Sequence, residues 1–160
     1  MTSALAASER VFVEQRLSTR AAALELFWVF AAERLGVELA QDISGQDGRA
    51  CRRLRGLLHA AHIDTHIPDH CDLLLTYADT WSLADGPRVV THIRNRLAHP
   101  TETEQLYQLG GLVSQAADLA GRYLDLLLLW ELGYEGHVMD RTKHGGWAGD
   151  SNTVPWSSRA

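Results

Sequence analysis

The chain has 160 residues, 46% of them hydrophobic and 22% charged, with a formal net charge of −5. This length provides one domain with a real core, and the balance of apolar and charged residues excludes wholesale disorder. The acidic net charge excludes a uniformly basic surface that coats nucleic acid, so any RNA contact must be local.

Apolar residues recur at three- and four-residue steps from Ser8 to Leu35, which predicts a first helix. Ser18 and Thr19 are the place where it could divide into two pieces, and Gly36 is a suitable stop signal. The cluster of Ser, Gly and Asp from Asp42 to Gly48 predicts a turn.

A second helix is predicted from about Arg49 to Ala61, with Cys51, Leu54 and Leu58 facing inward. Its other faces carry the strongest basic patch of the chain, which consists of Arg49, Arg52, Arg53 and Arg55. Such a patch suits a phosphate backbone. The alternative is a solvated face whose arginines pair with nearby carboxylates.

Four histidines, His59, His62, His66 and His70, follow at spacings of three, four and four, and Cys71 adjoins the last. Imidazole and thiolate suit zinc, but Pro68 prevents one continuous helix from holding the four rings in a stripe. We therefore expect loop and surface histidines, with no metal and no cofactor.

Pro68 is predicted to open a third helix that runs to about Trp81, with Leu74, Tyr77, Ala78 and Trp81 at core spacing. The next segment, Pro87 to His99, reads as a fourth helix bracketed by Pro87 and Pro100.

The fourth helix has a core side and a polar side. Its core side carries Val89, Val90, Ile93 and Leu97, its polar side carries Arg88, His92, Asn95 and His99, and Arg94 lies between them. An imidazole, an amide and a guanidinium are thus offered together near the end of one helix. We expect Arg88, His92 and Arg96 to assist Arg49, Arg52 and Arg53 in contacting RNA.

A long final helix is predicted to begin at the capping-box sequence Thr101 to Glu104 and to end at Gly133. Gly110-Gly111 is a point at which it could kink. The tail, residues 135–160, has no period and is predicted to be loop, with Trp147 and Trp156 folding back onto the bundle. The core helices are thus expected at about 8–134 of a single all-α domain of about five helices covering residues 1–160.

Two features of the sequence bear on the cellular compartment in which the protein is expected. Cys51 and Cys71 are too few for a disulfide framework and follow no signal-peptide pattern, which favours the cytoplasm. The apolar run from Leu124 to Leu132 contains two acidic residues and is shorter than the ~20 residues that span a bilayer, so no membrane contact is expected.

The pattern Arg94-Asn95-x-x-x-His99, at the end of a helix in an all-helical chain, resembles the Arg-x4-6-His signature of the HEPN superfamily. The polar residue directly after the arginine matches the form associated with ribonuclease activity. The stretch from Trp130 to Gly136 and the sequence Val154-Pro155-Trp156 resemble the ends of Apea-like HEPN domains, a branch linked to bacterial antiphage defence. The resemblance implies a helical bundle that forms a homodimer in which two copies of the motif face one cleft.

The residues of the motif suit metal-independent RNA cleavage, which needs a proton taken from the 2′-hydroxyl and a proton given to the 5′-oxygen. An unperturbed imidazole, with a pKa of about 6.5, serves both purposes, which makes His99 the acid–base candidate. Arg94 would stabilise charge on the phosphate and Asn95 would orient the ring or the phosphate. The resemblance implies 2′,3′-cyclic phosphate and 5′-hydroxyl products.

Two alternatives stay open beside a ribonuclease acting in defence or with an antitoxin or other regulatory protein. The chain could be a non-catalytic HEPN module that binds RNA, a nucleotide or a partner protein. It could also be a dimerisation scaffold in which Asn95 and His99 form hydrogen bonds across the interface.

Overall fold

The computed structural model describes residues 2–43, 45–99, 105–143 and 151–157. The described elements are α1 (Thr2–Leu35), α2 (Arg49–Ala60), α3 (Asp72–Trp81), α4 (Gly86–Leu97), a helical turn at 105–108, α6 (Leu112–Glu131), β1 (His137–Met139) and β2 (Ser151–Thr153). The prediction of an all-α bundle is confirmed.

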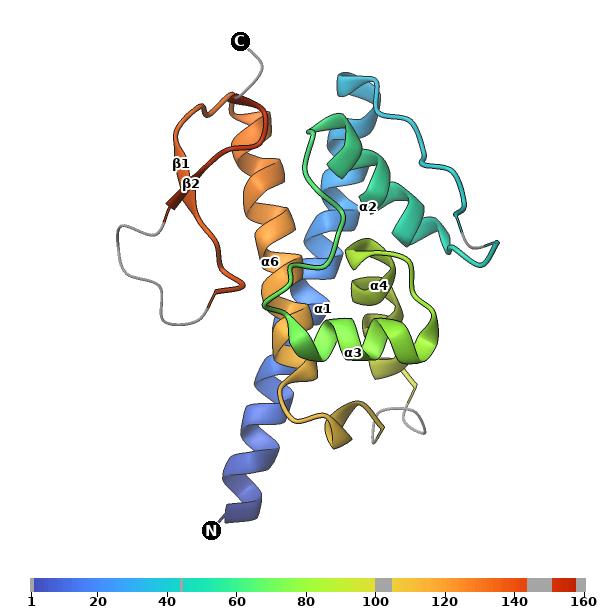
Figure 1. Cartoon of the computed structure of the whole chain (residues 1–160), viewed down its shortest axis with the longest axis vertical. Coiled ribbons are helices and arrows are strands. Elements are labelled where there is room, and N and C mark those ends of the chain that lie inside the picture. Colours follow the sequence, from blue (N-terminus) through green and yellow to red (C-terminus); the bar gives the residue numbers. More distant parts are fainter. Residues whose placement is uncertain (1, 44, 100–104, 144–150, 158–160) are drawn as a thin grey trace.

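Two helices that run in the same direction, α1 and α6, form the spine of the bundle (Figure 1). Ion pairs between the two helices show the shared direction. Arg16 and Arg20 of α1 pair with Asp118, and Arg34, further along α1, pairs with Glu131, further along α6. Helices α2, α3 and α4 cover one side of this spine, and the tail covers another (Figure 1). The buried leucines between the layers, among them Leu17, Leu57 and Leu119, form the core.

Helix α1 is continuous for 34 residues, so the break considered at Ser18 and Thr19 does not occur. It ends where predicted. Gly36 has φ of +64°, and the amide of Val37 donates to the carbonyl of Ala32 at 2.8 Å. This left-handed cap is the conformation that glycine adopts without a Cβ penalty. Gly133 ends α6 in the same way, as predicted.

Three predicted helix starts are wrong. Helix α1 begins at Thr2 rather than at Ser8. Helix α3 begins at Asp72, because Pro68 lies in a turn that is closed by the Cys71 amide donating to the Pro68 carbonyl at 2.8 Å. The long final helix is interrupted, since Gly111 has φ of +95° and caps the start of α6. A left-handed residue cannot continue a right-handed helix. The predicted capping box at Thr101 to Glu104 lies outside the described residues.

The prediction that the tail holds only loop is also wrong, since β1 pairs antiparallel with β2, Val138 opposite Asn152. Strands of three residues are too short to show an alternating pattern in the sequence. The tail does fold back, as predicted for Trp156. This ring packs against the core, and its Nε1 donates to the Tyr134 carbonyl at 2.6 Å. Trp147 lies outside the described residues.

A buried ion network joins α2 to the start of α4. Arg55 donates from Nε to Asp85 at 2.6 Å and from Nη1 to Asp47 at 2.7 Å, and its side chain is 1% exposed. The prediction that Arg55 belongs to the outer basic patch is therefore wrong. Asp85 is also the N-cap of α4, accepting the amide of Arg88 at 2.9 Å. The network consequently fixes where α4 begins.

Candidate functional site

Helix α4 carries the candidate catalytic residues. Its core side is as predicted, with Val89, Val90 and Ile93 buried and Pro87 in the first turn. The helix ends at Leu97 rather than His99. His99 therefore lies in the bend that follows, where its amide donates to the Arg96 carbonyl at 3.1 Å and its side chain is exposed.

Arg94 and Asn95 lie together on the exposed side of α4. Nη1 of Arg94 donates to Oδ1 of Asn95 at 3.1 Å. Within the described residues no carboxylate pairs with Arg94, and no acceptor takes a hydrogen bond from the Asn95 amide nitrogen. A guanidinium without an ion partner, beside unused N–H donors, suits an anionic ligand.

Both side chains line a surface pocket between α1, α2 and α4, called here the α1/α2/α4 pocket. Its empty volume, including the open mouth, is about 420 Å³. The pocket is lined by Ala21, Leu24, Glu25, Ala50, Arg53, Leu54, Val90, Thr91, Arg94 and Asn95. Its floor is formed by apolar side chains, among them the buried Leu24, Leu54 and Val90. Its rim is formed by polar side chains, among them the exposed Arg94 and Asn95. His99 does not line it, so the structure brings Arg94 and Asn95 together in one pocket and leaves His99 outside.

The opposite edge of α4 packs against α3. His92 lies 5.4 Å from the ring of Trp81 and hydrogen-bonds through Nδ1 to the Tyr77 hydroxyl at 3.0 Å. Arg96 is 8% exposed, stands 4.3 Å from the Trp81 ring and donates to Gln105. Burial contradicts the placement of Arg96 on an RNA-contacting surface, and His92 is part of the same packed cluster.

The arginines predicted to contact RNA fall into two groups: some make internal contacts, and others are exposed or line the pocket. Arg52 donates to the Ala40 carbonyl at 2.8 Å, and Arg88 lies 3.5 Å from Asp47 with its side chain 15% exposed. These two arginines hold the connection between α1 and α2, which the sequence pattern could not show. Arg49 is exposed without an ion pair in the described part of the chain, and Arg53 lines the pocket.

One candidate site residue, Glu25, was missed from the sequence, and the burial of Trp81 was predicted wrongly. Glu25 pairs with Arg53 at 2.7 Å and lines the pocket, although its place in the first helix carries no motif. Trp81, which was expected in the core, is 43% exposed. Only the helix spacing of Glu25, one turn after Ala21, could have placed it beside the pocket.

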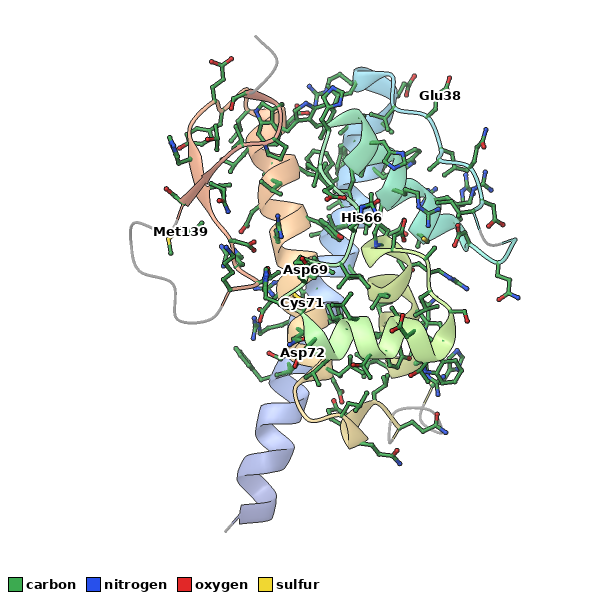
Figure 2. All side chains as sticks on the ribbon, viewed as in Figure 1. Glu38, His66, Asp69, Cys71, Asp72 and Met139 are labelled. Atoms are coloured by element: carbon green, nitrogen blue, oxygen red, sulfur yellow. The ribbon has the colours of Figure 1, made fainter. Side chains whose placement is uncertain are left out.

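The histidines between α2 and α3 do not converge. His66 pairs with Asp64 at 2.7 Å, and His70 hydrogen-bonds to Thr142 at 2.7 Å. Figure 2 shows His66 and Cys71 at separate places along this connection. Within the described residues, no three His, Cys, Asp or Glu side chains are grouped as metal ligands.

Both cysteines are buried thiols. Burial raises the pKa of Cys51 to about 12, with Arg55 opposing the shift, and burial also raises the pKa of Cys71. A thiol that stays protonated is a poor nucleophile. Neither cysteine therefore belongs to a reactive site in this arrangement.

The fold and the pocket define a small helical-bundle protein with an arginine-rimmed surface pocket. The chain belongs to the YopA C-terminal domain family, whose model matches residues 4–153. It is 32% identical over 158 residues to the SPbeta prophage-derived uncharacterized protein YopA of Bacillus subtilis (strain 168). That match covers 92% of this chain and 32% of the relative, so the chain spans about a third of the relative's length. No solved structure matches the chain.

No described helix has both the length and the apolar character required to cross a membrane.

Proposed function

We propose that this chain is a metal-independent endoribonuclease of HEPN type, with Arg94, Asn95 and His99 at its active site. One observation carries the proposal. Arg94 is an exposed cation without an ion partner among the described residues, beside Asn95 and within one to two helical turns of an exposed His99. These are the groups that phosphodiester cleavage by a neighbouring hydroxyl requires.

In the proposed reaction the 2′-hydroxyl loses its proton to an imidazole while its oxygen forms a bond to phosphorus. The bond from phosphorus to the 5′-oxygen breaks, and a second imidazole gives that oxygen a proton. The products are a 2′,3′-cyclic phosphate and a 5′-hydroxyl. Arg94 stabilises the charge on the non-bridging oxygens, and Asn95 orients the phosphate.

One chain supplies one His99, so the proposal includes a homodimer in which a twofold axis brings two copies of the motif to one cleft. The setting proposed is the bacterial cytoplasm, in antiphage defence or in a toxin–antitoxin pair. The name of the relative gives it a prophage origin, which is compatible with a role in antiphage defence or in a toxin–antitoxin pair. An antitoxin or another regulatory protein would restrain the activity.

The decisive experiment incubates the purified chain with total RNA and tRNA in excess chelator. We expect cleavage by the wild type and a loss of about 100-fold or more in His99→Ala and Arg94→Ala. His59→Ala is the matched control, because His59 is also exposed and lies at the end of another helix. Mass spectrometry of the ends should find cyclic phosphates.

Cleavage that persists undiminished in His99→Ala would overturn the proposal. Ultracentrifugation of the same variants tests the scaffold alternative, which expects His99→Ala to lose the dimer. The ribonuclease proposal expects the dimer to remain.

A second candidate is a non-catalytic module that binds RNA, a nucleotide or a partner protein. Its support is that Arg55, Arg88 and Arg96 are engaged in internal contacts, which leaves a modest basic surface on a chain of net charge −5. Saturable RNA binding without any turnover at high protein concentration would favour it.

A further inference from the structure

We infer that the α1/α2/α4 pocket is a nucleotide subsite that selects guanine, and that Glu25 reads the base. This inference rests on the proposed ribonuclease function and names the part of the substrate that the pocket holds. The occupant is one guanine nucleotide of the RNA strand, with its phosphate at the arginine rim and its ring on the apolar floor.

The floor suits a planar ring. Ala21, Leu24, Leu54 and Val90 supply aliphatic surface. Base faces stack on apolar and guanidinium planes without sequence preference, so the floor binds a base without choosing it.

The rim suits a phosphate. Arg94 has no carboxylate partner in the described part of the chain, and Arg53 pairs with the carboxylate of Glu25. The rim therefore has two guanidiniums and one carboxylate. Arg49 lies one turn before Arg53 on α2 and adds a third cation near the mouth. The excess positive charge is complementary to a phosphodiester.

The base is chosen by Glu25. Its Oε2 accepts from Nη1 of Arg53 at 2.7 Å, while Oε1 accepts no hydrogen bond from the described residues, and the side chain is 36% exposed. The ion pair therefore holds the carboxylate in place and leaves one oxygen available. A carboxylate accepts N–H donors only. Guanine presents two neighbouring donors, N1–H and N2–H, on one edge.

Guanine also presents the acceptors O6 and N7, and the pocket has a donor for one of them. The Asn95 amide nitrogen has no acceptor within the described structure. Among the four bases, guanine alone offers paired donors together with acceptors.

The test measures binding of GMP, AMP, CMP and UMP to the whole chain by equilibrium dialysis at low salt. We expect GMP to bind at least about tenfold more tightly than the others, as one good base-edge pair provides. Glu25→Ala should abolish this preference yet keep mononucleotide binding, because it frees Arg53 for the phosphate. Glu33→Gln, on the exposed side of the same helix, is the matched control and should keep the preference.

Equal binding of the four nucleotides, no binding at all, or a preference that survives in Glu25→Ala would overturn the inference. Should Glu25→Ala fail to fold, Ala21→Met provides a second test, since it fills the floor and should weaken all four nucleotides. Cleavage in chelator is scored separately. Guanine-selective binding without cleavage would refute the ribonuclease proposal alone, and cleavage without base preference would refute the subsite alone.

Discussion

Replacing Arg55 with methionine should destabilise the fold more than any surface arginine substitution. Arg55 donates to Asp85 and Asp47, whose side chains are 7% and 0% exposed. Methionine keeps much of the volume but leaves Asp85 buried without a cation, and it leaves Asp47 with Arg88 at 3.5 Å in place of the closer Arg55. Removing one partner of a buried ion pair costs about 3–5 kcal/mol, a large part of a total stability of about 5–15 kcal/mol.

Urea unfolding followed by circular dichroism measures this loss. With a slope of about 2 kcal/mol per molar, a loss of about 4 kcal/mol lowers the midpoint by about 2 M. Arg49→Met makes the same chemical change on an exposed position of the same helix and should stay within about 0.5 kcal/mol. Adding Asp47→Asn to Arg55→Met should recover part of the stability, because it removes one of the two buried negative charges. A midpoint shift below about 0.5 M for Arg55→Met would refute the reasoning.

Tyr123→Phe should leave the free energy of unfolding unchanged or raise it by up to about 1 kcal/mol, since the hydroxyl is buried without a partner in the described structure. A loss above 1 kcal/mol in a thermal melt would show that the hydroxyl is satisfied. Gly56→Ala should destabilise the fold by more than about 1 kcal/mol, because a Cβ there would stand 2.4 Å from the Glu38 carbonyl oxygen. The midpoint of urea unfolding measures this loss. Cys51 and Cys71 should resist a thiol reagent at pH 8 and both react after unfolding. The raised pKa of Cys51 also means that stability falls as pH rises above about 9, where the unfolded chain alone releases the proton.

The sequence was sufficient for those parts of the fold that depend on neighbouring residues. The core side of α4 follows from the spacing of Val89, Val90 and Ile93. The ends of α1 and α6 follow from Gly36 and Gly133, because glycine is the residue that a left-handed cap favours. These features are decided within a few residues of chain.

Other features depend on contacts that are distant in sequence, and the pattern could not reveal them. Arg53 and Arg55 lie on one helix two residues apart, yet one reaches Glu25 at the pocket and the other is buried against Asp85. Helical spacing sets Arg55 beside Cys51 and Leu58 on the inward side and Arg53 away from it, but it says nothing of which carboxylates approach from elsewhere. The packing of Trp81 was missed for the same reason, since the cation over its ring comes from Arg96 of another helix.

The burial of Arg55 between its two acids has a consequence for how the molecule responds to dissolved electrolyte. Counterions screen charges that face water and scarcely reach a pair enclosed by protein, because the screening length is about 10 Å at 0.1 M. Adding sodium chloride should therefore weaken anything held by Arg49 and Arg94 long before it loosens the attachment of α4. Ionic strength thus distinguishes the cations that maintain the architecture from those that face outward.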